Sequence, residues 1–235
     1  AYSYEYERLV PGMSAWDAGK RLREVTPTLR KLWQGDYEHN GEFFQFPSTT
    51  SAPKPIQENG PPIWIAARDP NSFEFAVSND FNVQVTPLWQ GMSEISSLMN
   101  SFKTARNNNV GKSPKIMLLH HTYVAKDTLD EEQAIQELTQ FFCYFGAWFQ
   151  NKRPVLQGAI KPLTHQEIAE NKVITPQYIA DNLTIGTVSK VIDRIKQYED
   201  MGYDEFSFWI DSGLSGQRKK NNLARFINEV MPAFQ

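Results

Sequence analysis

The sequence predicts an α/β fold built on a parallel sheet, and three observations favour this class. Short apolar runs typical of buried strands alternate with segments of helical periodicity three times between residues 63 and 149. The same alternation resumes after residue 187. A helix closes the chain. Repeated strand and helix units imply parallel strands joined by right-handed crossovers.

The N-terminal part is predicted to form one helix and then a long loop. Apolar residues recur near helical spacing from Ser14 to Trp33, with Ser14 as a cap and Pro27 as an irregularity. Residues 34–62 are rich in Pro, Gly, Ser and Asn, which indicates a loop with a short hairpin around GEFFQF.

The remaining elements follow in order along the chain. Strands are predicted at residues 63–67, 81–87, 115–125 and 205–211, and helices at 72–79, 93–108, 130–149, 189–202 and 221–234. Thr187 is expected to cap the fourth of these helices. An excursion over residues 150–183 interrupts the alternation, so we expect an insertion there.

Composition restricts the class of protein. With 235 residues, 40% of them hydrophobic and 22% charged, the chain can bury a sizeable core. A net charge of -3 without a basic stripe argues against a nucleic-acid partner. No apolar run approaches the ~20 residues of a membrane span. The single cysteine, Cys143, cannot form an intrachain disulfide, which suits a reducing, cytoplasmic location.

Two architectures fit four strands with intervening helices. An open doubly wound sheet is disfavoured because neither G-x-G-x-x-G nor G-x-x-x-x-G-K occurs. A closed barrel needs about eight strands in ~250 residues, so this alternative places several strands upstream of Ala1.

Four segments carry a family resemblance: LRKLWQGDYEHNGEFFQF, PKPIQENGPPIWIAARDPNSFEFAV, IGTVSKVIDRIKQYEDMGYDEFSFWID and FINEVMPAF. In this order and spacing they resemble the bacterial luciferase-like, flavin-dependent monooxygenases. The resemblance implies a (β/α)8 TIM barrel, of which residues 1–235 would be one incomplete domain lacking the first strands, with an insertion near 150–183.

The resemblance also implies the chemistry. Reduced FMN, supplied by a separate flavin reductase, would react with O2 to oxygenate a small organic substrate, and the protein is expected to be a homodimer. A deazaflavin-dependent hydride transfer and a non-catalytic flavin-binding relative remain alternatives. No nucleophile elbow or metal-protease signature is present, and a metal-dependent hydrolase is the least favoured reading.

The predicted cofactor site begins where the first central strand ends. Ala66 and Ala67 are small enough to admit a ligand edge, Arg68 can pair with phosphate oxygens, and Ser72 offers a hydroxyl. Asp69 lies at the start of the following helix, where unpaired N–H groups suit a phosphate. The resemblance assigns this loop to the flavin phosphate.

A structural alternative stands beside that assignment. Asp69 or Asn71 would cap the helix, and Arg68 would form a surface ion pair. Other members of the family often carry small hydroxyl residues where Arg68 and Asp69 stand.

Four more residues complete the predicted cofactor site. The resemblance nominates Tyr2 and Arg21 for the phosphate, although an arginine on an amphipathic helix is more often solvated. Thr86 and Pro87 end the next strand and, with Trp89, could wall a flat flavin ring. Trp89 could equally be a packed loop aromatic.

His120 and His121 are the weak candidates for catalysis. Adjacent residues of a strand point to opposite faces, so the two imidazoles are not expected to share a metal ion. One would face the interior of the barrel and the other a covering helix. Buried structural histidines are the favoured interpretation.

Overall fold

The computed structural model describes residues 10–150, 152–211 and 213–234. It divides into two compact units, Ala1–Trp64 with Ser78–Phe81 and Ile65–Val77 with Asn82–Gln235. Among the described residues, no helix is long and apolar enough to cross a membrane.

The first unit contains a helix and a hairpin. Helix α2 (Ala15–Gln34) begins with a capping box in which the Ser14 hydroxyl accepts from the Asp17 amide, and it includes Pro27. Strands β1 (Tyr37–Asn40) and β2 (Gln45–Thr49) pair antiparallel, which confirms the predicted hairpin.

Glu24 fastens the hairpin to α2. Its carboxylate accepts hydrogen bonds from the amides of Phe43 at 3.0 Å and Phe44 at 2.8 Å, and it lies 3.1 Å from Nε2 of His39. Burial alone would raise the pKa of Glu24, but these hydrogen bonds outweigh it and lower the pKa.

The second unit is built on a five-stranded sheet, ordered β3-β4-β5-β8 with β9 also pairing β5. The strands are β3 (Trp64–Ala66), β4 (Asn82–Val85), β5 (Ile116–Val124), β8 (Thr184–Gly186) and β9 (Glu205–Trp209). The β4–β5, β5–β8 and β5–β9 pairs are parallel, which confirms the predicted parallel sheet, and β5 is the central strand. The described strands do not close into a barrel.

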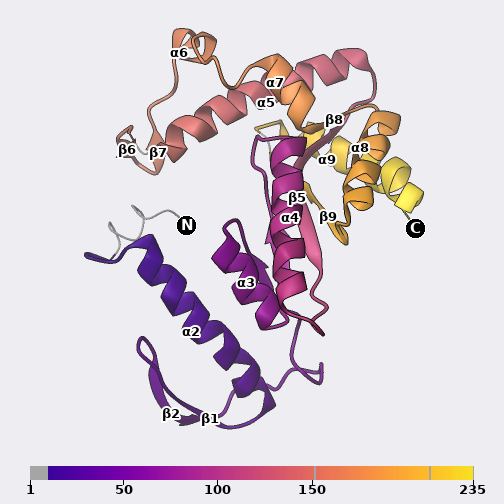
Figure 1. Ribbon diagram of the computed structural model, residues 1–235. Helices are drawn as coiled ribbons and strands as arrows, with labels where there is room; N and C mark the ends of the chain where they lie inside the picture. The colour runs from indigo at the N-terminus through magenta and orange to yellow at the C-terminus, as the bar shows by residue number, and fades with distance from the viewer. Residues whose placement is uncertain (1–9, 151, 212, 235) are drawn as a thin grey trace. The chain divides into compact units, whose positions relative to one another are not determined.

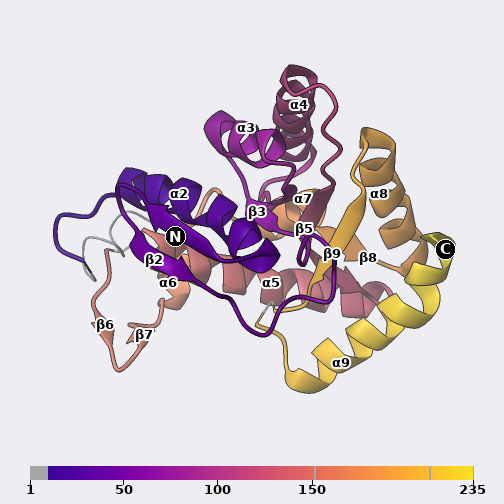
Figure 2. The ribbon, with the colours of Figure 1, turned by 90° about the horizontal axis from the view of Figure 1, so that it is seen from below.

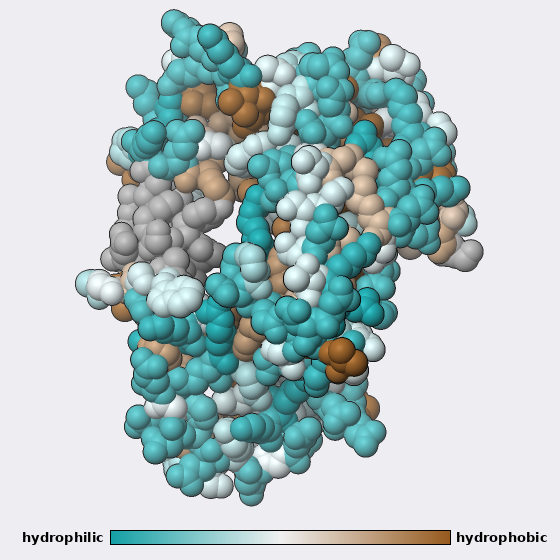
Figure 3. Space-filling view, in the orientation of Figure 1, coloured by the Kyte–Doolittle hydropathy of each residue, from teal (hydrophilic) through white to brown (hydrophobic). Residues whose placement is uncertain are grey.

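Helices lie beside this sheet. They are α3 (Pro70–Ser78), α4 (Met92–Asn108), α8 (Val188–Met201) and α9 (Gly216–Arg225), followed by a π-helical turn η1 (Phe226–Val230) and a 3₁₀ turn η2 (Met231–Phe234). Figure 2 shows α3 and α4 near β3, and α8 near β8. The outward side of α4 is polar to neutral in Figure 3, in keeping with exposed Asn100, Lys103 and Thr104.

The segment between β5 and β8 forms the insertion. It contains α5 (Thr128–Phe149), a small hairpin of β6 (Val155–Leu156) and β7 (Ala159–Ile160), α6 (His165–Ala169) and α7 (Pro176–Asn182). Figure 1 shows α5 running across the carboxyl end of β5 rather than alongside it. A Cβ at Gly91 would lie 1.9 Å from the Asn182 side chain, so the end of α7 rests on the loop before α4.

Two elements differ most clearly from the prediction. Helix α9 begins at Gly216 instead of residue 221, because Ser215 caps it by accepting from the Arg218 amide. The three-residue strand β8 was not predicted as a separate strand, since so short a segment has little periodicity. Its pairing with Thr122, Tyr123 and Val124 of β5 is what defines it.

The two faces of β5 have different surroundings. Ile116, Leu118 and His120 are buried, whereas Met117 and Leu119 are only partly covered. We call the side of Met117 and Leu119 the inner face and the other side the helix face. Cross-strand partners share a face, so the inner face also carries Ser207 and Trp209, opposite Leu119 and His121.

Candidate functional site

The carboxyl ends of parallel strands are where β/α proteins gather ligands, and the predicted cofactor residues of the second unit lie there. Ala66 ends β3, and the Ala67 amide donates to the Gln84 carbonyl at 3.0 Å, so the pairing continues one residue past β3. Thr86 and Pro87 directly follow β4. Ala66, Ala67, Thr86 and Pro87 are therefore neighbours at one edge of the sheet.

Arg68 reaches across this edge to the β4–α4 loop. Its guanidinium donates to Glu94 Oε1 at 2.9 Å, to Gln90 Oε1 at 3.1 Å and to the Thr86 carbonyl at 3.4 Å. The Arg68 side chain remains 48% exposed. An exposed ion pair of this kind contributes only about 0–1 kcal/mol, so another anion could exchange for Glu94 at small cost.

Asp69 directly precedes α3, in the position that caps the helix. Its carboxylate accepts from the amides of Asn71 at 3.0 Å and Ser72 at 3.1 Å, and from the Ser72 hydroxyl. Burial would raise the pKa of Asp69, but the hydrogen bonds from Ser72 and Asn71 lower it. The carboxylate thus takes the helix amides that a phosphate would use.

These contacts match the structural alternative at Arg68 and Asp69. The Asp69 carboxylate accepts from the amides of Asn71 and Ser72, and Glu94 accepts from Arg68. A phosphate bound here would therefore have to displace the Asp69 carboxylate. The assignment of the loop to a flavin phosphate stays a prediction. Tyr2 lies outside the described residues. Arg21 belongs to the first unit, where its guanidinium lies 4.7 Å from the Phe43 ring centre and its buried Nε has no hydrogen-bond partner.

The loop after β4 has a strained backbone. Leu88 has φ of 58°, a left-handed conformation uncommon for a branched side chain, and its amide donates to the Thr86 hydroxyl at 3.2 Å. This turn sends Trp89 toward α5, where its ring packs edge-on against Phe142, Phe145 and Phe149. Trp89 is thus a packed aromatic in this structure.

His120 lies on the helix face and is fully buried. Its Nδ1 is 2.9 Å from the Thr184 hydroxyl and 3.2 Å from the Tyr198 hydroxyl, and those two hydroxyls are 3.0 Å apart. Burial, with Arg194 nearby, lowers the pKa of His120 to about 3. His120 is a neutral member of a buried polar cluster beneath α8.

His121 points the other way. It is also fully buried, and its ring stacks on Trp209 with centroids 3.8 Å apart and meets Phe142 edge-on at 4.7 Å. Neither ring nitrogen has a hydrogen-bond partner among the residues that the structure describes. Burial, with His120 as a smaller influence, lowers the pKa of His121 to about 3. The two histidines therefore face opposite sides, as strand geometry requires.

Sequence reasoning missed Trp209. The sequence alone places Trp209 in the last predicted strand, and the register of the sheet pairs it directly with His121. An aromatic residue at the end of a strand is a weak signal in sequence. Its partner across the sheet is set by tertiary pairing.

The insertion contributes a cavity of about 480 Å³ between α5 and the segment that follows it. Trp89, Cys143, Lys152 and Arg153 are among its lining residues. Arg153 pairs with Glu167, and the Lys161 carbonyl accepts from Arg153 at 3.2 Å. His165 starts α6 and does not line this cavity. Burial raises the pKa of the Cys143 thiol, which is consequently a poor nucleophile.

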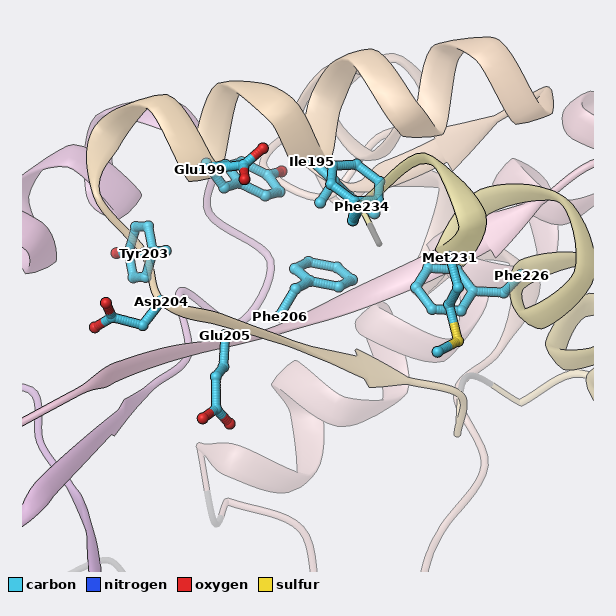
Figure 4. A pocket seen from close by; sticks show the side chains of 10 residues that line it. Ile195, Glu199, Tyr203, Asp204, Glu205, Phe206, Phe226, Met231 and Phe234 are labelled. Carbon is cyan, nitrogen blue, oxygen red and sulfur yellow. The ribbon is translucent and has the colours of Figure 1, made fainter.

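A second cavity, of about 370 Å³, lies between α8, β9 and the C-terminal turns (Figure 4). Figure 4 shows Phe206 and Glu205 on opposite sides of β9, with Phe206 toward α8. The cavity borders the amino end of β9, away from the edge where ligands gather in β/α folds. In the part of the chain that the structure describes, no cluster of three or more His, Cys, Asp and Glu residues could hold a metal ion.

Comparison with known proteins gives two kinds of similarity. The family model described as luciferase-like monooxygenase matches residues 5–205. The chain is 58% identical, over all 235 residues, to the oxygenase component of a flavin-dependent trigonelline monooxygenase from Acinetobacter baylyi. It spans 65% of the length of that relative.

Solved structures share the fold at low sequence identity. The monooxygenase RslO1 from Streptomyces bottropensis matches with a TM-score of 0.75 and 18% identity, over 100% of this chain and 67% of that one. The oxygenating constituent of 3,6-diketocamphane monooxygenase from Pseudomonas putida, in complex with FMN, matches with a TM-score of 0.70 and 14% identity, over 99% and 68%.

Proposed function

Because the chain belongs to the luciferase-like monooxygenase family, we propose that it acts in the oxygenase component of a two-component, flavin-dependent monooxygenase. Reduced FMN from a separate flavin reductase and O2 are the co-substrates of this proposal. The observation that carries it is the 58% identity along the whole chain to an oxygenase component of that type.

The proposed substrate class follows from the same relative. Trigonelline is a pyridinium ring that carries an N-methyl group and a carboxylate, so its net charge is zero. The relative is named for action on trigonelline. We propose for this chain a small zwitterionic carboxylate whose heteroaromatic ring carries the positive charge.

The residues at the carboxyl ends of the strands suit a planar ring. Trp209, His121 and Phe142 supply flat, neutral walls, and α5 lies across this end of β5 and keeps water away. When bound, reduced flavin supplies the electrons that activate O2. The chain itself binds, orients and shields the reactants.

We propose that the phosphate end of the flavin binds at the carboxyl ends of β3 and β4 and the loops that follow them, which we call the rim. Ala66, Ala67, Arg68, Asp69, Ser72, Thr86 and Pro87 are the residues proposed for it, with Tyr2 and Arg21 as further anchors. The proposal requires Arg68 to leave Glu94 and the Asp69 carboxylate to turn out of the first turn of α3. Residues 1–235 forming a single barrel domain with an insertion, a homodimeric state and a cytoplasmic location are parts of the same proposal.

Oxygen consumption tests the function. The purified protein is supplied with reduced FMN, and oxygen uptake is recorded with and without trigonelline while the product is identified by mass spectrometry. Substrate-dependent oxygen incorporation supports a monooxygenase. Binding of FMN without incorporation would instead indicate a non-catalytic flavin-binding protein. Turnover only with a reduced deazaflavin would indicate hydride transfer.

A further inference from the structure

We propose that His121 and Trp209, on the inner face of β5 and β9, form the substrate-recognition pair. Trp209 accepts the cationic ring of the substrate, and His121 donates a hydrogen bond to its carboxylate. This inference rests on the proposed function and specifies which residues of the site select the substrate.

The position of His121 separates it from its neighbour. Because His120 faces Thr184 and α8, His121 faces the inner side of the sheet. Residues before it on this side, Met117 and Leu119, are partly open. His121 is the point where that side becomes fully covered, through ring contacts with Phe141 and Phe142 of α5.

The ring nitrogens of His121 give the site its polar function. A neutral imidazole has one N–H donor and one acceptor nitrogen, and in the described part of the chain both are buried without a partner. Such groups are rare in folded proteins, because no hydrogen bond offsets the free energy that their desolvation costs. A carboxylate oxygen brought to the N–H would satisfy the donor and gain a charge-assisted bond.

The indole of Trp209 gives the site its aromatic function. One face stacks on His121, and the residue as a whole is only half-buried. Tryptophan is the side chain that attracts cations most strongly over its ring. A pyridinium or another quaternary nitrogen compound therefore suits the part of the indole that stays accessible.

The charge of the surroundings favours a ligand with no net charge. The His121 ring contacts the rings of Phe141, Phe142 and Trp209, and none of these three side chains is ionised. A buried single charge without a partner is costly, whereas a zwitterion carries its own counter-charge. The pair should therefore prefer trigonelline over nicotinate, which lacks the N-methyl group and is an anion.

Binding measurements with three probes test the pair. Trigonelline, nicotinate and the N-methylpyridinium ion are titrated by calorimetry into the unsubstituted protein and into His121→Phe, His121→Asn and Trp209→Leu, with and without FMN. The control is Phe226→Leu, since Phe226 packs on Phe206 and Phe208 from the helix face. Thermal melting reports the folding of every variant.

The expected results differ by probe. His121→Phe should weaken trigonelline binding about 10- to 100-fold, the range for a hydrogen bond to a charged group, and leave N-methylpyridinium within about twofold. His121→Asn should recover part of the loss because it keeps a donor. Trp209→Leu should weaken trigonelline and N-methylpyridinium about 5- to 30-fold and spare nicotinate. Phe226→Leu should change none of the affinities.

Three results would overturn the inference: no binding of trigonelline to the unsubstituted protein, unchanged affinity in His121→Phe, or an equal loss for all three probes in a folded variant. Oxygen uptake by the unsubstituted protein is scored separately. If trigonelline is oxygenated but His121→Phe retains its affinity, the pair is refuted and the function stands. If the variants behave as expected but no oxygenation occurs, the function is refuted and the binding pair stands.

Discussion

The two faces of β5 bury neighbouring histidines in opposite ways. On the helix face, Nδ1 of His120 meets the hydroxyls of Thr184 and Tyr198, whereas its Nε2 has no partner among the described residues. On the inner face, His121 lies among aromatic rings and leaves both nitrogens without partners. Burial is complete on both sides, so exposure does not distinguish them. His120 thus has one partnered ring nitrogen and His121 has none, and this difference separates a structural histidine from a candidate for binding.

Acidification should produce the largest effect, because it favours the unfolded chain at both histidines at once. The pKa values of His120 and His121 are lowered to about 3 in the folded protein. Between about pH 6.5 and pH 3 the unfolded chain therefore binds more protons, and stability falls as the pH falls. From pH 8 to pH 5 the two together should lower the free energy of unfolding by on the order of 4 kcal/mol.

Urea denaturation at pH 8, 6.5 and 5 measures this loss. His121→Phe should remove about half of it, since one of two titrating groups is gone. A free energy of unfolding that stays constant over this range would show that the histidines are not held neutral.

The helix face should give the next largest effect. Tyr198→Leu removes a buried ring and one hydroxyl of the His120 cluster, and should lower the free energy of unfolding by about 3 kcal/mol. Tyr198→Phe keeps the ring and should cost about 1 kcal/mol, because His120 and Thr184 still pair. Trigonelline affinity should not change in either variant. A loss of trigonelline affinity in Tyr198→Phe would show that the helix face also contributes to binding.

On the inner face, a substitution should raise the free energy of unfolding instead of lowering it. His121→Phe removes two unsatisfied buried nitrogens and keeps an aromatic ring, so stability at pH 8 should rise by about 1 kcal/mol. The same change at His120 should destabilise the protein. Chemical denaturation of both variants compares the faces directly, and a destabilised His121→Phe would indicate a structural role for His121.

The rim beyond β3 should show the smallest effect on stability. Arg68→Gln breaks an exposed pair with Glu94 and should change the free energy of unfolding by less than about 1 kcal/mol. If the guanidinium holds the flavin phosphate, FMN affinity should fall about tenfold. Fluorescence titration with FMN measures it, and an unchanged affinity would leave Arg68 as a surface residue only.

Local patterns predicted most of the elements. The hairpin, the central strands and the helices between them lie close to their predicted ranges because apolar periodicity and capping residues are local signals. Alternation along a strand also predicted that His120 and His121 face opposite sides. At the rim, both interpretations of Arg68 and Asp69 were available from sequence, and the contacts observed are those of the cap and the ion pair.

The sequence by itself determined the α/β class, the family and the opposite orientation of two adjacent histidines, since these follow from periodicity and residue order. Only the tertiary structure decided which histidine has a partnered ring nitrogen among the described residues. That outcome depends on Tyr198 and Thr184, 78 and 64 residues away, reaching one face and on Trp209 and α5 reaching the other. Contacts between residues so far apart arise from strand pairing and helix packing, which no local pattern encodes.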